Sequence, residues 1–523
     1  GVVLPPARER RCCPMAAISL CHGSLPLATH AISGVQSPLQ HKVRNWPELG
    51  RYSVLATAVA FRCCCHGSRG RPGRHVARAT DTRVSESKLP EMIATKGVPV
   101  VLYAPMNEVE DQALEQLISL AESPLPVGHV AAMPDVHMGK GVAIGAVFAS
   151  EKYVCPNAVG VDIGCGMCAV PIKGLYKDDL TQEDLRQLQS LLKARIPTSF
   201  DSHDAQLPWA KETLKDISRE HHPTEYLAKR LEKESKIGLQ LGTLGGGNHF
   251  LEVVYSEDDE QVWCMLHSGS RNVGNTTASF YDRVAGERGV ALRGLHGSLN
   301  YLDVESKDGK NYLKDMQWCQ AYARENRRSM LELMISTVEE VTGKKADLSR
   351  AVNAHHNFCQ CETCNFFDSK SGQVKEKKLW VTRKGATSAR AGEYGIIPGS
   401  MGVGSYIVKG RGARGSWQSC SHGAGRTMSR TAAKKVIAQE TFVASMKGIV
   451  CDTNPAVRDE APQAYKDLGQ VLKNQADLVE VEYRLLPLVN VKGFEEKSGF
   501  KSQKRSESKH KQKPRRKKNN QRH

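Results

Sequence analysis

Glycine-rich loops punctuate the middle of this chain and divide it into separate segments. Five of them stand out, at Met138–Gly145, Gly160–Gly166, Gly242–Gly247, Gly399–Gly404 and Gly423–Gly425. Glycine adopts backbone conformations that other residues avoid, and it lets a ligand come close to the main chain. The loops therefore predict a fold in which the backbone can wrap phosphate groups at several places.

Between these loops the sequence predicts a mixture of helices and short strands. A helix is expected to begin after Thr181, with Asp184 as its capping partner, and to stop before Pro197. No regular alternation of strand and helix is present, so we expect an α+β fold with one large domain of mixed β-sheets flanked by helices. The other expected elements are helices over Asn107–Glu122 and Asp315–Val341, the latter ended by Gly343, and strands over Val98–Tyr103, Val142–Phe148, Val262–Leu266 and Leu379–Thr382.

The net charge of +17 is concentrated in the two ends of the chain. Residues 1–90 and 494–523 each carry a net charge of +9, which leaves the middle close to neutral. This pattern favours three parts: a low-acid extension over 1–92, a folded domain over 93–493 and a basic tail over 494–523. We expect both ends to be disordered, because such segments resist packing.

The composition of the first extension bears on the compartment. It is rich in Arg, Ser, Ala and Gly and poor in acidic residues, as organelle transit peptides are. With such a peptide the protein is expected in a chloroplast or mitochondrion, and without it in the cytoplasm or nucleus. No stretch reaches the ~18 apolar residues that cross a bilayer.

The cysteines favour a reducing compartment, because most of the 16 are scattered without paired spacing. A group at Cys359, Cys361 and Cys364 is close enough in sequence to suggest zinc. It lacks a second ligand pair nearby, which weakens that hypothesis.

Five side chains suited to transition metals lie beside glycine turns or apolar runs. Asp162 and Cys165 are three residues apart in one glycine turn, and the imidazoles are His249, His267 and His356. A carboxylate, a thiol and three imidazoles suit Mn²⁺, Zn²⁺ or Co²⁺ better than Mg²⁺ or Ca²⁺. Because five ligands exceed one tetrahedral site, we expect two ions bridged by the thiolate of Cys165.

Another histidine, His422, stands in the run Ser421–Arg426 among small residues. Small neighbours leave room for a bulky electrophile at the imidazole, and the guanidinium of Arg426 offers donors to phosphate oxygens. A nucleophilic histidine that attacks a nucleotide phosphate needs this arrangement. Further candidate phosphate contacts, close to a glycine or serine, are Arg271, Arg383, Lys384 and Arg430.

Seven motifs follow one another along the chain: Pro134–His137, Gly160–Gly166, Gly242–Phe250, His267–Arg271, Arg383–Thr387, Pro398–Gly402 and Ser421–Arg426. In type and order they match the RtcB-type RNA ligases, which the chain resembles from about Val98 to Gly493, most closely in the bacterial form. The resemblance implies a GTP- and Mn²⁺-dependent enzyme. Such an enzyme joins RNA ends with a 3′-phosphate or 2′,3′-cyclic phosphate to 5′-hydroxyl ends, in tRNA splicing or RNA repair.

The resemblance also implies a role for each matching residue. It makes His422 the nucleophile that takes GMP, and it selects His356 rather than His355 as a ligand because the family ligand precedes an asparagine, here Asn357. The implied ligands of two Mn²⁺ ions are Asp162, Cys165, His249, His267 and His356. The implied guanylate contacts are Asn248, Glu252, Ser400, Gly423, Gly425, Tyr465 and Lys492. The implied phosphate or RNA contacts are Arg271, Lys384, Arg426 and Arg430.

The expected partners are RNA ends such as tRNA halves, together with GTP, and no membrane. An activating protein is a further candidate partner. Two features depart from the family pattern: thirty residues follow Lys492-Gly493, where members usually end, and Leu486 stands where an arginine is common.

Three other activities remain open from the residues alone. A metal-dependent cyclic phosphodiesterase or phosphatase would use the same ions but would not need His422. An enzyme that guanylylates 3′ ends as a cap would stop before joining. A non-catalytic RNA-binding protein would act through its basic ends. Trapping a covalent GMP adduct separates the phosphodiesterase from the ligase.

Overall fold

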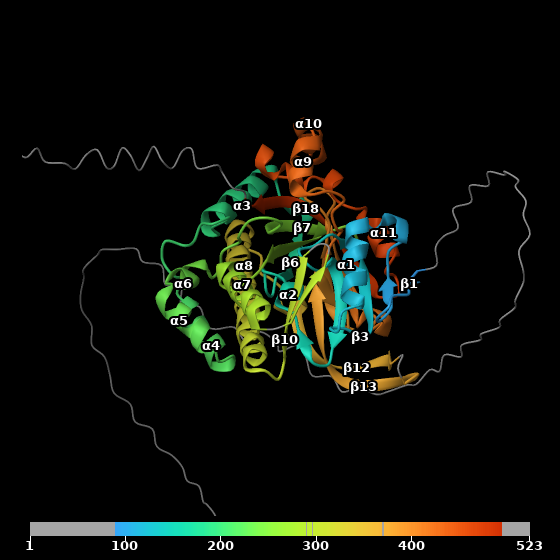
Figure 1. The fold of residues 1–523 in the computed structure, drawn as a ribbon. Helices are drawn as coiled ribbons and strands as arrows, with labels where there is room; N and C mark the ends of the chain where they lie inside the picture. The colour runs from blue at the N-terminus through green and yellow to red at the C-terminus, as the bar shows by residue number, and fades with distance from the viewer. Residues whose placement is uncertain (1–88, 289, 295–296, 369–370, 494–523) are drawn as a thin grey trace, which may run out of the picture. The chain divides into compact units, whose positions relative to one another are not determined.

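The computed structural model describes residues 89–288, 290–294, 297–368 and 371–493, all within one unit of the chain, Arg62–His523 (Figure 1). Helices and strands are mixed along these residues, so the expected α+β fold with one large domain is confirmed. The predictions made for residues 1–88 and 494–523 lie outside the described residues.

The larger sheet is antiparallel throughout and has seven strands. Each strand pairs only with strands that run the opposite way, so chain segments from distant parts of the sequence end side by side. In sheet order the strands are β11 (Val352–His355), β6 (Gly166–Tyr176), β8 (Gln261–Ser268), β7 (Phe250–Ser256), β18 (Val479–Lys492), β16 (Ser405–Gly410) and β15 (Tyr394–Pro398).

A second sheet has six strands, in which only β2 and β3 run parallel to each other. In sheet order they are β1 (Glu91–Ile93), β2 (Val100–Leu102), β3 (Val127–His137), β4 (Ile144–Ser150), β13 (Gln373–Lys384) and β12 (Asn357–Asp368). Two small sheets complete the described strands. They are β5 (Tyr153–Val154), β10 (Gly297–Asp303) and β9 (Val290–Gly294), and the pair β14 (Ala386–Ser388) and β17 (Ser419–Ser421).

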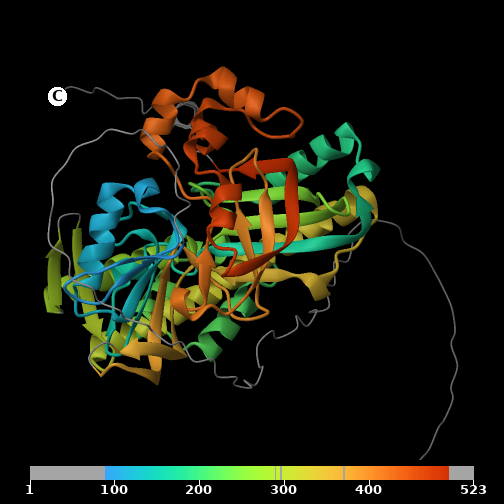
Figure 2. The same ribbon diagram turned by 90° about the vertical axis from the view of Figure 1, so that its right-hand side faces the viewer.

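Helices flank these sheets. The long helix α8 packs against α7, α3 and the strands β6 and β8, and α1 packs against β3. Both ribbon views show α9 and α10 (orange) grouped apart from the hairpin of β12 and β13 (Figures 1 and 2). The α-helices are α1 (Asp111–Ala121), α2 (Pro156–Val159), α3 (Gln182–Arg195), α4 (Ala210–Glu220), α5 (Glu225–Lys233), α6 (Lys236–Gln240), α7 (Arg271–Arg288), α8 (Lys307–Thr342), α9 (Arg430–Val436), α10 (Gln439–Ser445) and α11 (Leu468–Lys473). Short 3₁₀ turns are η1 (Met106–Glu108), η2 (Lys177–Asp179), η3 (Leu348–Arg350), η4 (Arg414–Ser416), η5 (Pro455–Glu460) and η6 (Pro462–Ala464).

The predicted helices exist, but two of them begin elsewhere. Thr181 and Asp184 form the expected capping box of α3, and Gly343 ends α8 in the left-handed conformation with φ 69°. The helix predicted from Asn107 begins only at Asp111, after a 3₁₀ turn. The helix predicted from Asp315 begins earlier, at Lys307, where the hydroxyl of Ser306 caps it.

Two of the four predicted strands lie within β8 and β13, the strand predicted over Val98–Tyr103 contains the shorter β2, and the fourth overlaps β4. Their buried faces form the core, in which Trp263 and Trp318 are among the largest fully buried side chains. Among the described residues, no helix is long and apolar enough to cross a membrane.

Candidate active site

The antiparallel pairing of the large sheet brings several chain segments to the same end of that sheet. β6 starts at Gly166, opposite Ser268 at the end of β8. β7 starts at Phe250, opposite Lys492 at the end of β18. The loop before one strand therefore lies beside the last residues of its neighbour. This arrangement brings the five predicted metal ligands close together: Asp162, Cys165, His249, His267 and His356.

These five side chains form one contiguous cluster. The sulfur of Cys165 lies 3.4 Å from Nε2 of His249 and 3.3 Å from Nε2 of His267. Nε2 of His267 lies 3.2 Å from Nε2 of His356, and Oδ2 of Asp162 lies 3.0 Å from Nε2 of His249. All except Asp162 are buried. The residues predicted to hold metal thus meet in space.

Backbone carbonyls orient two of the rings. Nδ1 of His249 lies 2.9 Å from the carbonyl oxygen of Leu244, and Nδ1 of His267 lies 3.2 Å from that of Asn248. A neutral imidazole that donates through Nδ1 has only a lone pair at Nε2. Lone pairs and sulfur then face one another, which is unfavourable unless a cation lies between them. The donor set therefore fits a transition-metal ion.

The protonation states point the same way. Burial, followed by the charges of neighbouring histidines, holds the pKa values of His267 and His356 well below the usual range, so both rings are neutral as metal ligands must be. Burial raises the pKa of Asp162, but its contact with His249 outweighs burial and the pKa falls to about 2. Burial and Asp162 raise the pKa of Cys165, which a bound cation would offset.

A buried guanidinium on α8 ties together the two loops that carry these ligands. Nη1 of Arg327 donates to the carbonyl oxygens of Gly164 at 2.7 Å and Ser268 at 3.1 Å. Its Nη2 donates to Nδ1 of His355 at 3.0 Å. His355 therefore faces Arg327, whereas the next residue, His356, enters the cluster.

His422 directly follows β17 and lies beside the cluster. Its ring centroid is 4.9 Å from that of His356. Nδ1 donates to Oδ2 of Asp135 at 2.6 Å, and the backbone N–H of His422 donates to the same oxygen at 3.1 Å. Asp135 lies near the end of β3 and is fully buried. This contact holds the proton on Nδ1 and leaves the lone pair on Nε2, the form that a nucleophilic imidazole needs.

A cavity of about 310 Å³ opens beside His422, and we call it the His422 cavity. Its volume falls within the roughly 300–1,000 Å³ of small-molecule sites. Oγ of Ser400 and Oδ1 of Asn490 on its wall find no hydrogen-bond partner among the described residues. Because orphaned buried polar atoms are costly, the cavity fits a polar ligand. All seven predicted guanylate contacts line it: Asn248, Glu252, Ser400, Gly423, Gly425, Tyr465 and Lys492.

Glu252 lies on the wall of this cavity as a buried carboxyl group. Its Oε1 accepts a hydrogen bond from Nδ2 of Asn490 at 2.7 Å. Burial raises the pKa of Glu252 to about 7, against the opposing effects of Asn490 and of the Lys492 ammonium. The side chain can therefore change protonation state near neutral pH.

Four predicted contacts meet on a residue that the sequence did not single out, Glu460 of η5. Its Oε2 accepts from Nζ of Lys492 at 3.0 Å and from the hydroxyl of Tyr465 at 2.8 Å. Arg430 pairs with the same carboxylate, and Arg426 donates to the Tyr465 hydroxyl at 2.9 Å. Burial raises the pKa of Glu460, but Lys492 and Arg430 outweigh it and bring the pKa to about 2.

Three predicted phosphate contacts do not line the His422 cavity, and one of them, Arg383, is fully buried and paired with Glu362. The other two donate to backbone oxygens. Nη2 of Arg271 donates to the carbonyl oxygen of Ser199 at 2.6 Å. Nζ of Lys384 donates to the carbonyl oxygens of Lys140 at 2.7 Å and Asn157 at 3.0 Å. Burial lowers the pKa of Lys384 to about 8. Both cations are thus engaged elsewhere, whereas Arg426 and Arg430 line the cavity.

The cysteine group on β12 does not converge. Side chains alternate between the two faces of a strand, so Cys364 points to the opposite face from Cys359 and Cys361. Cys359 is buried and Cys361 is exposed. One zinc ion cannot reach all three from a single strand.

Sequence reasoning missed three side chains that organise this site. Asp135 stands inside a recognised motif, and its position two residues before His137 was the available signal. Glu460 and Arg327 carry no local signal, because an acid beside prolines and an arginine within a helix are ordinary surface patterns. Only the fold brings them to the site.

The fold and the site define a class of protein: an α+β protein with a thiolate, carboxylate and imidazole cluster beside a histidine that lines a ligand cavity. The family model described as "tRNA-splicing ligase RtcB" matches residues 116–493. The chain therefore belongs to the RtcB family, as the motifs indicated.

Individual relatives agree with this assignment. The chain is 39% identical over 431 residues to the RNA-splicing ligase RtcB of Escherichia coli (strain K12), a match that covers 77% of this chain and 99% of the relative. It is 30% identical over 442 residues to the RNA-splicing ligase RtcB of Mycobacterium tuberculosis (strain ATCC 25618 / H37Rv), covering 72% and 100%. It is 29% identical over 470 residues to the tRNA-splicing ligase RtcB of Nanoarchaeum equitans (strain Kin4-M), covering 76% and 95%.

Proposed function

We propose that this enzyme is an RNA ligase that uses GTP and manganese and works through a covalent GMP adduct on His422. It joins RNA ends with a 3′-phosphate or 2′,3′-cyclic phosphate to 5′-hydroxyl ends, in tRNA splicing or RNA repair. The observation that carries the proposal is the hydrogen bond of 2.6 Å between Nδ1 of His422 and Asp135, made where the ring lines a cavity beside the imidazole cluster.

The metal site would use the cluster already described. Asp162, Cys165, His249, His267 and His356 would hold two Mn²⁺ ions. The contacts of the Cys165 sulfur, within 3.4 Å of two imidazole nitrogens, support a shared donor set. Bound there, the ions would supply positive charge against the phosphate groups of both substrates.

The histidine chemistry then follows from the orientation of the ring. Nε2 of His422 attacks the α-phosphorus of GTP, so a P–N bond forms and pyrophosphate leaves. Asp135 keeps the Nδ1 proton and stabilises the charge that the ring gains. An oxygen of the RNA 3′-phosphate next attacks the same phosphorus, and the P–N bond breaks. A 2′,3′-cyclic phosphate is first opened by one water molecule to the 3′-phosphate. The 5′-hydroxyl finally attacks the activated 3′-phosphate, gives up its proton to the departing GMP phosphate, forms the phosphodiester and expels GMP.

The preference for guanine is assigned to two groups in the His422 cavity. Guanine presents N–H donors at N1 and N2 and an acceptor at O6. The carboxylate of Glu252 can accept from the donors, and the ammonium of Lys492, held by Glu460 at 3.0 Å, can donate to the acceptor. Adenine has the opposite pattern at the corresponding positions, so the same groups would reject it. Ser400 and Tyr465 complete the walls.

The proposal is tested by incubating the purified chain with labelled GTP and Mn²⁺ and isolating the denatured protein. We expect wild type to retain one GMP in an acid-labile, base-stable bond, as a phosphoramidate does. His422→Ala is expected to retain none, whereas His221→Ala, at the end of α4, serves as a matched histidine control with wild-type labelling. Labelled His422→Ala would overturn the assignment. An adduct without joined RNA would indicate a capping enzyme, and RNA end hydrolysis without an adduct would indicate a phosphodiesterase.

A further inference from the structure

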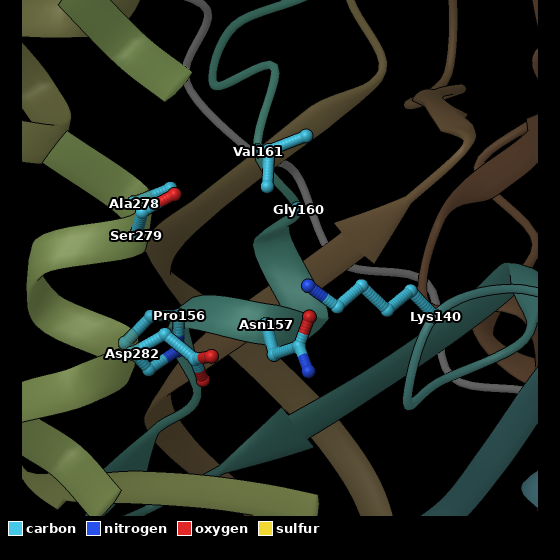
Figure 3. A pocket seen from close by; sticks show the side chains of 8 residues that line it. All are labelled: Lys140, Pro156, Asn157, Gly160, Val161, Ala278, Ser279 and Asp282. Carbon is cyan, nitrogen blue, oxygen red and sulfur yellow. The ribbon is translucent and has the colours of Figure 1, made fainter. Parts of the chain in front are cut away.

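A second hollow lies between α2 and α7, beside the loop that carries Asp162 (Figure 3). We call it the Lys140 hollow. Its lining includes Lys140, Asn157, Val161, Ser279 and Asp282. Its volume of about 120 Å³ equals about four water molecules at about 30 Å³ each. A phosphate with part of a sugar fits such a space, whereas a nucleobase with its sugar does not.

The Lys140 hollow and the His422 cavity share one connecting loop. Lys140 lines the hollow, while His137 and Ile144, at the two ends of the same loop, line the His422 cavity. Gln116 fixes this loop through a pair of hydrogen bonds with the backbone of Gly139, at 2.6 and 3.1 Å. The segment that joins the two linings is therefore well anchored.

Two further segments connect the lining of the Lys140 hollow with the metal cluster and with His422. Val161 lines the hollow, and the next residue, Asp162, belongs to the metal cluster, about 3.8 Å away between Cα atoms. Lys384 donates to two backbone oxygens of the hollow wall. The next residue, Gly385, lies so near His422 that a Cβ there would meet the ring at 3.0 Å. The segments that carry the metal cluster and His422 thus adjoin both spaces.

The polar groups in the Lys140 hollow suit a sugar–phosphate chain. The side chain of Lys140 reaches across the hollow above Asn157, and Asp282 enters from α7 on another side (Figure 3). The ammonium group of Lys140 provides positive charge for a phosphate, and the Ser279 hydroxyl provides a donor. The carboxylate of Asp282, whose Oδ1 accepts from Asn300 at 3.3 Å, can accept from a sugar hydroxyl. A ribose has such a hydroxyl at the 2′ position and deoxyribose lacks it.

The geometry of the joining reaction indicates which RNA strand the Lys140 hollow binds. In a phosphoryl transfer the attacking and leaving oxygens stand on opposite sides of the phosphorus, roughly in line. GMP, the leaving group of the last step, belongs to the His422 cavity. The attacking 5′-hydroxyl must therefore come from a separate site that adjoins the cluster, and the Lys140 hollow, which shares no lining residue with the His422 cavity, is such a site.

We propose that the Lys140 hollow binds the first internucleotide phosphate, and the 2′-hydroxyl edge of the ribose before it, of the RNA strand that carries the 5′-hydroxyl. Lys140 binds the phosphate, and Asp282 accepts a hydrogen bond from the ribose 2′-hydroxyl. The assignment rests on the proposed ligase function and adds a strand-binding site and a means of distinguishing RNA from DNA.

The test separates guanylylation from strand joining. Lys140→Gln, Lys140→Arg and Asp282→Asn are compared with Lys215→Gln, an exposed lysine of α4 that pairs with Glu212. Each variant is assayed for GMP adduct formation, and for joining with 5′-hydroxyl strands whose first nucleotide is either ribose or 2′-deoxyribose. We expect all four variants to form the adduct as wild type does.

The joining assay carries the distinguishing result. Lys140→Gln is expected to raise the KM for the 5′-hydroxyl strand about tenfold, the equivalent of one lost charged contact, and Lys140→Arg is expected to restore it. Asp282→Asn is expected to lose most of the wild-type preference for ribose over 2′-deoxyribose. Wild-type KM and wild-type preference in these variants would overturn the Lys140 hollow as a strand site. Absence of the GMP adduct in the wild-type chain would instead overturn the proposed ligase function.

Discussion

At Glu252, the protonation state that suits ligand binding is the one that lowers folding stability. It is buried in the His422 cavity, where burial raises its pKa to about 7. A carboxyl group whose pKa rises above 4.5 on folding contributes most to the stability of the folded state at low pH, where it is protonated in both the folded and the unfolded chain. As the pH rises from about 4.5 to 7, the unfolded chain ionises first and stability is lost. Near pH 8 ionisation of Glu252 destabilises the folded state by about 3 kcal/mol. The ionised carboxylate is also the form that can accept hydrogen bonds from the N–H groups of guanine.

Glu252→Gln is therefore expected to raise thermal stability at pH 8, with little change at pH 4.5. Thermal unfolding of both proteins across this range measures the difference. The same variant is expected to reduce the preference for GTP over ATP about 100-fold, because an amide replaces two acceptor oxygens by one acceptor and one donor. In wild type, GTP affinity should fall as the pH drops from 8 to 6. Equal pH profiles for the two proteins would contradict this role of Glu252.

Residue identity pointed to side chains that the structure brings together, but not to the residues that support them. His249, His267 and His356 are recognisable because glycine runs or strand ends flank them, and a metal-binding set has a known composition. Asp135 contacts His422 across 287 positions of sequence, and no spacing rule connects such a pair. Charge partners that depend on tertiary contact are therefore found only with the structure.

At the scale of elements, α8 does more than cover a sheet. It supplies Arg327, which is fully buried and donates to backbone oxygens of the two loops at Gly164 and Ser268, beside the candidate metal cluster. Burial lowers the pKa of this guanidinium to about 10, so it remains charged at neutral pH. A buried charge is retained at a cost, which suggests that it is needed to hold those loops in register.

Replacing this guanidinium should weaken metal binding before it weakens the fold. Arg327→Lys keeps the charge but cannot donate to both Gly164 and Ser268 in the same fork geometry. We expect Mn²⁺ affinity to fall 10- to 100-fold, as for other residues that orient ligands, measured by electron paramagnetic resonance titration of free Mn²⁺. Arg328→Gln, the neighbouring residue that pairs with Glu325 and Glu332, is the control. Unchanged Mn²⁺ affinity in a folded Arg327→Lys protein would contradict the positioning role.

Helices with clear caps were predicted to within a residue at those ends, as Thr181 and Gly343 illustrate. The start of α1 was placed wrongly at Asn107, because Pro105 and Met106 lead into a 3₁₀ turn before the helix. Sheet order was beyond sequence reasoning altogether. The edge strands β11 and β15 come from residues more than a hundred positions beyond β6, and no local pattern encodes that pairing.

At the scale of the whole molecule, positive charge and catalytic groups are separated along the sequence. The candidate site is built entirely from residues 135–492, whereas net charges of +9 lie in residues 1–90 and again in 494–523. Affinity for a polyanion depends on such charge and falls with added salt, as counterions are released on binding. Histidine chemistry and purine selection depend on buried contacts that salt screens much less.

Removing residues 494–523, with Lys492 and Gly493 kept, should therefore weaken RNA binding without disabling the site. We expect GMP adduct formation, and turnover at saturating RNA, to stay close to wild type. RNA affinity at 50 mM salt should fall, and the slope of its logarithm against the logarithm of salt concentration should become shallower. A full-length variant with the 12 tail Lys and Arg residues changed to Gln separates the effect of charge from that of chain length. If that variant kept the wild-type salt slope, tail charge would not contact RNA. If the truncated chain formed no adduct, the site would extend beyond the sheet end at Lys492.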